Sequence, residues 1–461
     1  MRRITAIAWL TWKAAFRFRL FLVLAALLLA SVVGLPILIK DDGTARGFAQ
    51  IFLTYTLSVI TVLLSLSTLW LACGTLARDI EECQMQIVAT KPIARWQIWL
   101  GKWLGIMLLD AALLALSGAC VCGLLQWRAA KLPAAEQKIL REQILVARGS
   151  AKPAIAAADI ENETERLLQN RLRNTPVDKA DVPEMRKQIR ELVKADLQLV
   201  PPVYSRTWNI DLGWAKHFLS GQPLQLRVKF NSAERNPSGT FVALWQVGEP
   251  EKTALWRSEP MSLAPDTFHE FQIPPDLFNG AGVLTVTFMN LNNTSLLFPI
   301  EDGVEVLYPE GSFTLNFVRG LGIIFCWMAL LAALGLMAAS FLTFPVAAFF
   351  SLALVTMVLS SRTLAEAVEA GTVAAGHSES GIVGSSSLDV VLIPMFKGFL
   401  AVIGLVKSFS PVDALSSGRS IPWSELGTAF GQIVLLLGGM VCLIGIMLFS
   451  RRELAATQGN S

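Results

Sequence analysis

Four long runs of uncharged residues constrain this chain more than any other feature. They cover residues 20–39, 50–77, 320–361 and 426–450. A bilayer core of about 30 Å needs roughly 20 helical residues, so each run is long enough to cross a membrane. The run at 320–361 would reach roughly 63 Å as one helix, at about 1.5 Å per residue. We therefore expect it to form a helical hairpin that turns near residues 340–345.

Residues 103–127 form another apolar stretch, which has tryptophan at both ends and one charged residue, Asp110. Tryptophan is enriched where membrane helices meet water, so we expect a sixth span here. Asp110 would lie about 11 Å into this span. An ionisable group at that depth is costly unless it is paired or hydrated. Asp110 is therefore a candidate functional residue, although it could also bond a neighbouring helix or reach the interface.

A further segment, residues 388–409, is apolar but contains Pro394, Lys397 and Lys407. We expect an interfacial or re-entrant helix there, because a seventh span would move the basic pair Arg451 and Arg452 across the membrane. With six spans, basic residues cluster at the N-terminus, between spans two and three, and after the last span. The positive-inside rule then predicts that both termini are cytoplasmic.

The N-terminus has a basic start and an apolar core, as a cleaved signal peptide does. However, residues 1–19 precede the apolar core and include four aromatic side chains. A signal peptide rarely has so long and aromatic a start. We expect instead an interfacial amphipathic helix that leads into a retained first span.

Residues 128–314 separate spans three and four and would lie outside the cytoplasm. Residues 128–202 are rich in charge and in helix formers, which predicts a helical stalk. Residues 203–314 contain short alternating runs separated by Asn, Pro and Gly turns, which is typical of an antiparallel β-sandwich. Its size suits a jelly-roll-like module. Sugar binding, protein contact and a purely structural role all remain open, because fold alone does not establish ligand binding.

Several classes of function are disfavoured by composition. A net charge of +3 is too small to indicate nucleic-acid binding, and the six cysteines lie in or beside the apolar runs, so neither a disulfide framework nor a zinc site is expected. His217 and His269 have no metal-ligand spacing around them. No G-x-x-x-x-G-K-[ST] pattern occurs, so the chain should not bind a nucleotide in a P-loop. We expect no cofactor, no metal and no catalytic group.

The segment between spans two and three, residues 78–102, is the most informative one. It begins with acidic residues, continues with an apolar turn, reaches a proline and basic residues, and enters span three at Gly-Lys. A short projecting helix with charges and apolar side chains could dock into a partner and follow its motion. Alternatively, Lys91, Arg95 and Lys102 could merely enforce the positive-inside rule.

This segment resembles the loop between spans two and three of type-2 ABC exporter permeases. The amphipathic N-terminus, the six spans and the C-terminal exit at 449–454 extend the resemblance over residues 1–127 and 315–455. The chain departs from many members at Gln84-Met85-Gln86, where they have Gly-Thr. The resemblance implies that the following residues couple the chain to an ATPase: Glu81, Glu82, Ile87, Lys91, Pro92, Arg95, Gly101 and Lys102.

We therefore predict an α-helical polytopic membrane protein with about six transmembrane helices and an inserted α + β-sandwich (jelly-roll-like) domain outside the cytoplasm. Its expected parts are 1–127 (interfacial helix and spans one to three), 128–202 (stalk), 203–314 (β-sandwich) and 315–461 (spans four to six).

The predicted function is the permease subunit of an ATP-driven exporter in a bacterial cytoplasmic (inner) membrane. Its partners would be a separate ABC ATPase, a second permease subunit of the same or a related kind, and membrane lipids. The alternative is a membrane-anchored binding or scaffold protein that acts through its β-domain.

Overall fold

The computed structural model describes residues 2–16, 19–38, 44–82, 84–85, 93–153, 157–174, 182–232, 234, 239–250, 252–300, 302–359, 361, 365, 368 and 389–452. The chain forms two compact units. The helical unit comprises Met1–Ala147 and Gly311–Ser461, and the β-rich unit is Arg148–Glu310. The boundary expected at 127/128 differs from this division. Residues 128–147 belong to the helical unit because Leu140 and Ile144 are buried in its core.

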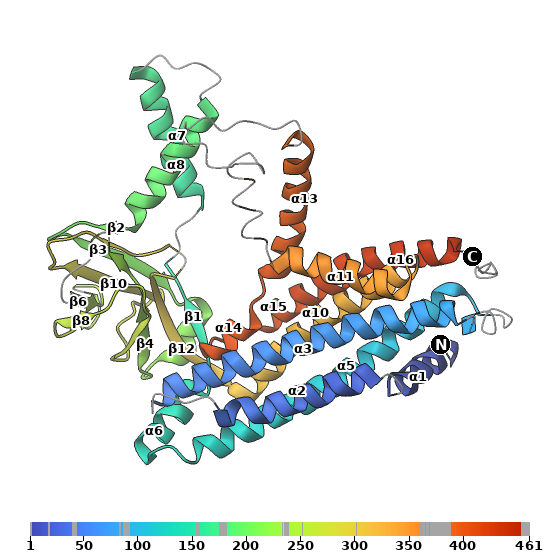
Figure 1. Cartoon of the computed structure of the whole chain (residues 1–461). Coiled ribbons are helices and arrows are strands. Elements are labelled where there is room, and N and C mark those ends of the chain that lie inside the picture. The colour runs from blue at the N-terminus through green and yellow to red at the C-terminus, as the bar shows by residue number, and fades with distance from the viewer. Residues whose placement is uncertain are drawn as a thin grey trace. The chain divides into compact units, whose positions relative to one another are not determined.

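The helical unit is built from long helices that lie side by side (Figure 1). Its elements are α1 (Arg2–Ala15), α2 (Arg19–Leu38), α3 (Ala45–Glu81), α5 (Arg95–Ala129), α6 (Ala134–Ile139), η1 (Leu140–Ile144), α10 (Phe313–Ala339), α11 (Phe344–Leu359), α13 (Asp389–Lys407), α14 (Pro411–Ser416), α15 (Trp423–Ala429), η3 (Phe430–Gly438) and α16 (Gly439–Arg451). The last three form one continuous helix that contains a π-helical stretch.

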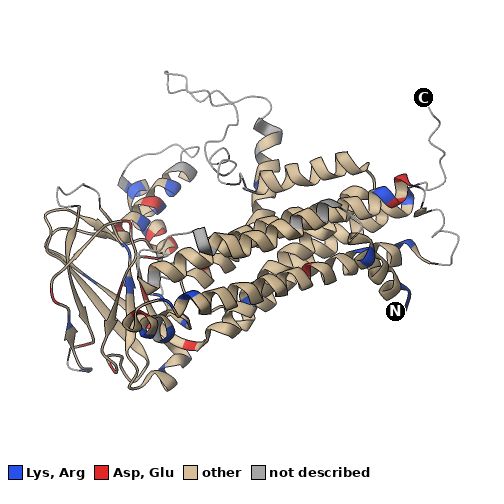
Figure 2. Ribbon diagram, turned by 60° about the horizontal axis from the view of Figure 1, so that its bottom comes forward, with Lys and Arg blue, Asp and Glu red and all other residues tan. Residues whose placement is uncertain are grey.

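Five helices among the described residues are long and apolar enough to cross a membrane: Gly47–Glu81, Arg95–Ala129, Phe313–Ala339, Pro394–Ser416 and Trp423–Arg451. Length and apolar composition are what a bilayer requires of a spanning helix, so this part of the chain fits a membrane-embedded protein. Figure 2 shows that charged residues are sparse along the middle of the bundle and gather toward its ends.

The expected spans can be compared with these helices one by one. The hairpin turn lies where it was expected, since α10 ends at Ala339 and α11 begins at Phe344. The first and fifth expected spans correspond to α2 and α11, in which shorter apolar stretches are found. The segment 388–409, expected to be interfacial or re-entrant, falls largely within Pro394–Ser416, which is long enough to span. The count of six spans therefore stays a prediction.

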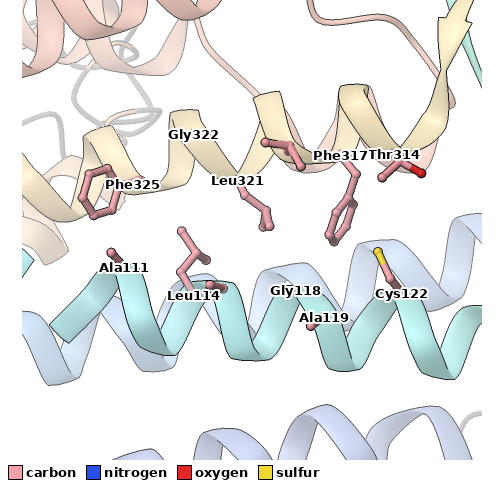
Figure 3. Close-up of a pocket in the computed structure, with 12 residues that line it drawn as sticks. Ala111, Leu114, Gly118, Ala119, Cys122, Thr314, Phe317, Leu321, Gly322 and Phe325 are labelled. Atoms are coloured by element: carbon pink, nitrogen blue, oxygen red, sulfur yellow. The ribbon is translucent and has the colours of Figure 1, made fainter. Parts of the chain in front are cut away.

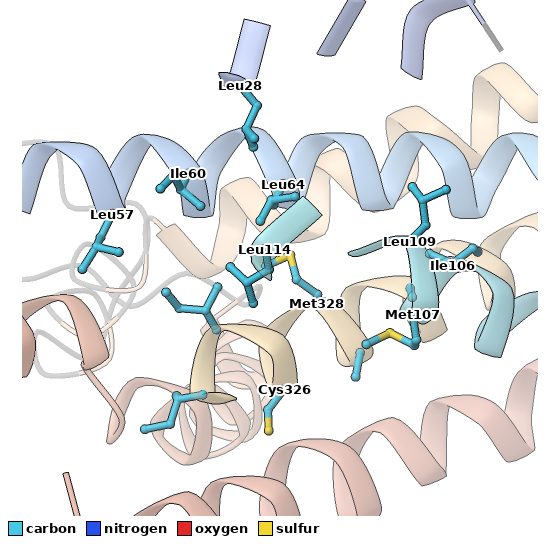
Figure 4. Close-up of a cluster of buried hydrophobic side chains, with 14 of the residues drawn as sticks. Leu28, Leu57, Ile60, Leu64, Ile106, Met107, Leu109, Leu114, Cys326 and Met328 are labelled. Carbon is cyan, nitrogen blue, oxygen red and sulfur yellow. The ribbon is translucent and has the colours of Figure 1, made fainter. Parts of the chain in front are cut away.

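The core of the bundle lies around α3. Thr44 starts this helix, because its side chain accepts a hydrogen bond from the Gly47 N–H at 3.1 Å and so satisfies one free donor of the first turn. Leu57, Ile60 and Leu64 are fully buried along one face, at the spacing of a helical stripe. Figure 4 shows these side chains beside residues of α5 and α10.

Among the described residues, twelve strands form three sheets in the β-rich unit and at its ends. They are β1 (Val146–Ala151), β2 (Leu199–Val200), β3 (Ser205–Asp211), β4 (Leu224–Val228), β5 (Asn231–Ser232), β6 (Phe241–Val247), β7 (Trp256–Arg257), β8 (Met261–Leu263), β9 (His269–Ile273), β10 (Val283–Asn290), β11 (Leu296–Leu297) and β12 (Val304–Ser312). The strand orders are β1-β12-β4-β9, β3-β10-β6-β7 with β8 on β6, and β2-β11-β5.

The β-rich unit has its own hydrophobic core. Leu224, Leu226 and Val228 of β4 are fully buried at alternate positions, as one face of a strand requires. Trp245 lies in the centre, with ring centroids 4.8 Å from Phe288 and 5.9 Å from Phe298. Aromatic side chains of this kind contribute much of the apolar area in a core.

Two helices of the β-rich unit, α7 (Ala157–Asn174) and α8 (Val182–Gln198), pack against each other. Leu168, Ile189 and Val193 are buried between them, while Arg186 bonds Glu161 at 2.5 Å on the exposed side. Both helices lie within residues 128–202, where a helical stalk was expected. The short elements η2 (Gly213–Ala215) and α9 (Lys216–Leu219) follow β3.

Candidate functional site at the loop end of the bundle

The residues expected to couple the chain to an ATPase lie at or near one end of the helical unit, where α3 ends and α5 begins. We call this the loop end. Ile87, Lys91 and Pro92 lie outside the described residues. The expected loop 78–102 is shorter than predicted, because α3 continues to Glu81 and α5 already begins at Arg95.

Arg95 binds the end of the last helix. Its Nη1 donates to the backbone carbonyls of Phe449, Ser450 and Arg452 at 2.9, 2.8 and 2.8 Å. The last carbonyls of a helix lack partners within the helix and carry partial negative charge. The guanidinium of Arg95 therefore caps α16 and fixes its C-terminus against the N-terminus of α5.

Arg452 binds the C-terminal end of α10 in the way that Arg95 binds the end of α16. Its Nη1 donates to the carbonyls of Ala339 and Ser340, both at 3.3 Å, which are the last carbonyls of α10. Together, Arg95 and Arg452 connect the ends of α5, α16 and α10 in series.

Lys102 is buried and joins α5 to α3. Its Nζ donates to the Thr75 carbonyl at 2.8 Å and to Asp79 Oδ2 at 2.5 Å. Thr75 and Asp79 are one turn apart on α3, so a single ammonium group bridges a backbone and a side-chain acceptor. A buried ammonium group is tolerated when it is paired in this way.

Glu81 joins α3 to α11. Its Oε1 accepts a hydrogen bond from the Phe344 N–H at 2.9 Å, and the first N–H groups of a helix need such an acceptor. The guanidinium of Arg78 lies 4.8 Å from the centre of the Phe344 ring, close enough for a cation–π contact.

Gly101 is a packing position for α1. A Cβ at Gly101 would lie 2.7 Å from Ile7 Cβ, and one at Gly105 would lie 2.7 Å from the Ala8 carbonyl oxygen. The two glycines therefore allow α1 to lie directly against α5. Gly105 was missed by the sequence analysis, although Gly101-x-x-x-Gly105 is the small-residue spacing that permits close helix approach in membranes.

Glu82 differs from the other described residues of the set. It ends α3, is exposed, and accepts a hydrogen bond from Gln84 Nε2 at 2.7 Å. Its carboxylate therefore lies at the start of the connecting segment, whereas Glu81, Arg95 and Lys102 bind other helices. The side-chain hydrogen bond of Glu82 therefore stays within the connecting segment.

Asp110 lies deeper in the bundle, where α3, α5 and α10 meet. It is 1% exposed. Its Oδ1 accepts a hydrogen bond from Thr68 Oγ1 at 3.0 Å, and the same hydroxyl lies 3.6 Å from Met328 Sδ. Among the described residues Oδ2 has no partner. Asp110 thus bonds a neighbouring helix, one of the two alternatives expected for it.

The described residues include no group of three His, Cys, Asp or Glu side chains that could hold a metal ion. His269 Nε2 lies 2.8 Å from the Ala264 carbonyl, a contact within the β-rich unit. The charged groups of the loop end are arranged to fix helix ends to one another, and this arrangement can transmit movement between helices.

No protein-family model matches the chain, and no curated protein matches it.

Proposed function

We propose that this chain is the membrane permease subunit of an ABC exporter whose ATPase is a separate polypeptide. The segment between α3 and α5 would contact the ATPase at the cytoplasmic side. ATP binding and hydrolysis would move this segment and shift a pathway through the membrane from inward to outward access.

The proposal rests on the hydrogen bonds and the ion pair that join helices at the loop end. Arg95 holds the last carbonyls of α16, and Lys102 holds Asp79 of α3. A displacement of the connecting segment would therefore act on α3 and α5 directly and on α16 through Arg95. Without these bonds, movement of the connecting segment would be transmitted less directly to α16.

Asp110 supplies a polar group within the moving part. Because Thr68 bonds only one of its carboxyl oxygens, a relative shift of α3 and α5 would break the hydrogen bond and change the environment of the carboxyl group. In the proposed mechanism Asp110 stabilises one arrangement of the helices.

The rival proposal is a binding or scaffold protein that acts through the β-rich unit. A single span would suffice to anchor such a protein. The described residues include five helices of spanning length, and Arg95 and Arg452 bond the ends of three of them, α5, α16 and α10. This arrangement suits a membrane protein that moves during transport, so we favour the permease.

The test starts from co-expression of the chain with an ATPase that lacks membrane spans and is encoded beside it. The complex is purified through a tag on the permease, and vanadate-sensitive ATP hydrolysis is measured in lipid. We expect the wild type to retain the ATPase, and Glu82→Arg to retain several-fold less, because a charge reversal would repel a complementary partner.

The matched control is Glu163→Arg on α7, where the carboxylate is exposed and pairs with Arg166 of its own helix. It should retain the wild-type amount of ATPase. A folded wild-type chain that retains none in lipid contradicts the exporter proposal. Equal retention by the two variants contradicts the role of Glu82.

A further inference from the structure

An open groove runs between α5 and α10 on the surface of the helical unit. Its volume is about 450 Å³, which is within the range of small-molecule sites in proteins. The residues that line it are Ala111, Leu114, Ala115, Gly118, Ala119, Cys122, Thr314, Phe317, Val318, Leu321, Gly322 and Phe325.

The groove exists because small residues of α5 face large residues of α10. Figure 3 shows Phe317 and Leu321 directed toward α5, and Ala111, Gly118 and Ala119 of α5 also line the groove. The helices are in close contact at Gly118, where a Cβ would lie 2.6 Å from Leu321 Cδ1. Ala115 and Ala119 are exposed, so the groove opens between them and the side chains of α10.

The length of the groove matches one leaflet of a bilayer. It extends from Ala111 to Cys122 on α5 and from Thr314 to Phe325 on α10, or about 16 Å at 1.5 Å per residue. One leaflet accounts for about 15 Å of a 30 Å hydrocarbon core. On α10 the groove occupies the first half of the helix, from its start to about the middle of the membrane.

The residues at one end of the groove are typical of the depth at which lipid headgroups lie. Thr314 is a polar lining residue in the first turn of α10, and α5 continues beyond Cys122 to Trp127. Lys131 Nζ lies 3.5 Å from the centre of the Trp127 ring. Exposed tryptophan and lysine side chains are typical of the interface between hydrocarbon and headgroups.

The groove is long for its volume, with about 450 Å³ spread over about 16 Å, and its lining is almost entirely apolar. A single acyl chain is slender, apolar and present at high concentration around any membrane-spanning helix. The dimensions and the lining therefore favour lipid.

The geometry points to a phospholipid site, in which the α5–α10 groove binds one acyl chain and the headgroup lies near Trp127 and Lys131. This inference requires only that α5 and α10 cross the membrane. It does not depend on an ATPase partner.

The test uses the full-length chain reconstituted in vesicles of phosphatidylcholine and phosphatidylglycerol that contain a phospholipid with a photoreactive diazirine in its acyl chain. After illumination, adducts are mapped by mass spectrometry. We expect several-fold more adducts in residues 111–122 and 314–325 than on the exposed face of α16, which carries Leu443 and Met447.

Two variants sharpen the test. Ala119→Trp fills the groove from its open side and should lower the adducts there several-fold. Val62→Trp places the same side chain on an exposed position of α3, where the residue is 64% exposed, and should leave the groove adducts unchanged.

Equal labelling of the groove and of α16 in the wild type would overturn the site. So would groove labelling that persists in a folded Ala119→Trp variant. If that variant does not fold, the wild-type map and Ala115→Phe, which narrows the groove by a smaller side chain, decide the question.

Discussion

Asp110 shows how much one side chain depends on its neighbours in the membrane. Its Oδ1 is bonded by Thr68, and that hydroxyl is its only hydrogen-bond partner among the described residues. Leaving a buried polar group without a partner costs about 1–3 kcal/mol, so the hydroxyl of Thr68 should matter more than that of an ordinary helix threonine.

We expect Thr68→Val to lower the thermal unfolding midpoint of the purified chain clearly more than Thr61→Val does. Thr61 lies two turns earlier on α3 and donates only to the Leu57 carbonyl of its own helix. Scanning fluorimetry in one detergent would compare the two variants. Combining Thr68→Val with Asp110→Leu should recover much of the loss, because both polar partners are then absent. Equal shifts for the two single variants would contradict this account.

At the residue scale, the sequence identified charged groups but not their partners. Arg95 and Lys102 were singled out as candidates for contact with another protein. In the structure Arg95 binds a carbonyl that lies 354 residues away in the chain, and Lys102 binds α3. A contact of such separation depends on how helices pack, which the local pattern of charge does not contain.

The helix ends are the elements on which the proposed mechanism depends. The cap by Arg95 satisfies carbonyls at the C-terminus of α16, and a cation at this position stabilises a helix end by about 0.3–2 kcal/mol. Removing it should loosen the last turn of α16 without unfolding the bundle.

We expect Arg95→Gln to speed hydrogen exchange in a peptide that covers the last turn of α16, by up to roughly 5- to 30-fold for a loss of 1–2 kcal/mol. The matched control is Arg451→Gln, because Arg451 is exposed and lies in the same turn. Hydrogen-exchange mass spectrometry would measure both. An unchanged last turn in Arg95→Gln would show that the cap adds nothing to the order of α16.

The contact of α1 with α5 can be tested through two glycines of one helix. At Gly105 a Cβ would lie 2.7 Å from both the Ala8 carbonyl oxygen and Thr11 Cβ, whereas at Gly123 nothing lies within 4 Å. Overpacking typically costs 1–3 kcal/mol, while alanine in an open helical position gains about 0.5–1 kcal/mol.

We therefore expect Gly105→Ala to lower the unfolding midpoint and to speed tryptic cleavage after Lys13 in α1. Gly123→Ala should keep or raise the midpoint and leave this cleavage unchanged. If both variants behave alike, α1 does not depend on the close approach at Gly105.

The sequence predicted some helices and strands and missed others. The long uncharged runs and the turn between α10 and α11 were visible because hydropathy is a local property. Strands β4, β6, β9, β10 and β12 lie within residues 203–314, where alternating runs predicted β-strands. Strand β3 was missed, since its polar residues become a strand by pairing along β10. Strand β1 was missed because its sequence, Val-Ala-Arg-Gly-Ser-Ala, has little β-propensity.

At the scale of the whole molecule, the two units have separate cores. The β-rich unit buries Trp245, Phe288 and their neighbours within itself. A unit with its own core is expected to fold alone.

We expect a fragment of residues 146–312 to be soluble and to unfold cooperatively when followed by near-ultraviolet circular dichroism. Trp245→Ala should destabilise it by about 3–5 kcal/mol. Val242→Ala, at a position of the same strand that is 40% exposed, should have a small effect. An aggregated fragment without a cooperative transition would show that the unit needs the helices to fold.

The positions at which the chain enters and leaves the β-rich unit bear on how this unit could have been gained in evolution. Its first and last strands, β1 and β12, are neighbours in one sheet, so the two points where the chain changes unit lie a strand's width apart. Closely spaced ends allow a whole domain to be inserted or removed. An ancestor could thus have gained this unit in one recombination event, and an engineer could replace it with another module while keeping the helices unchanged.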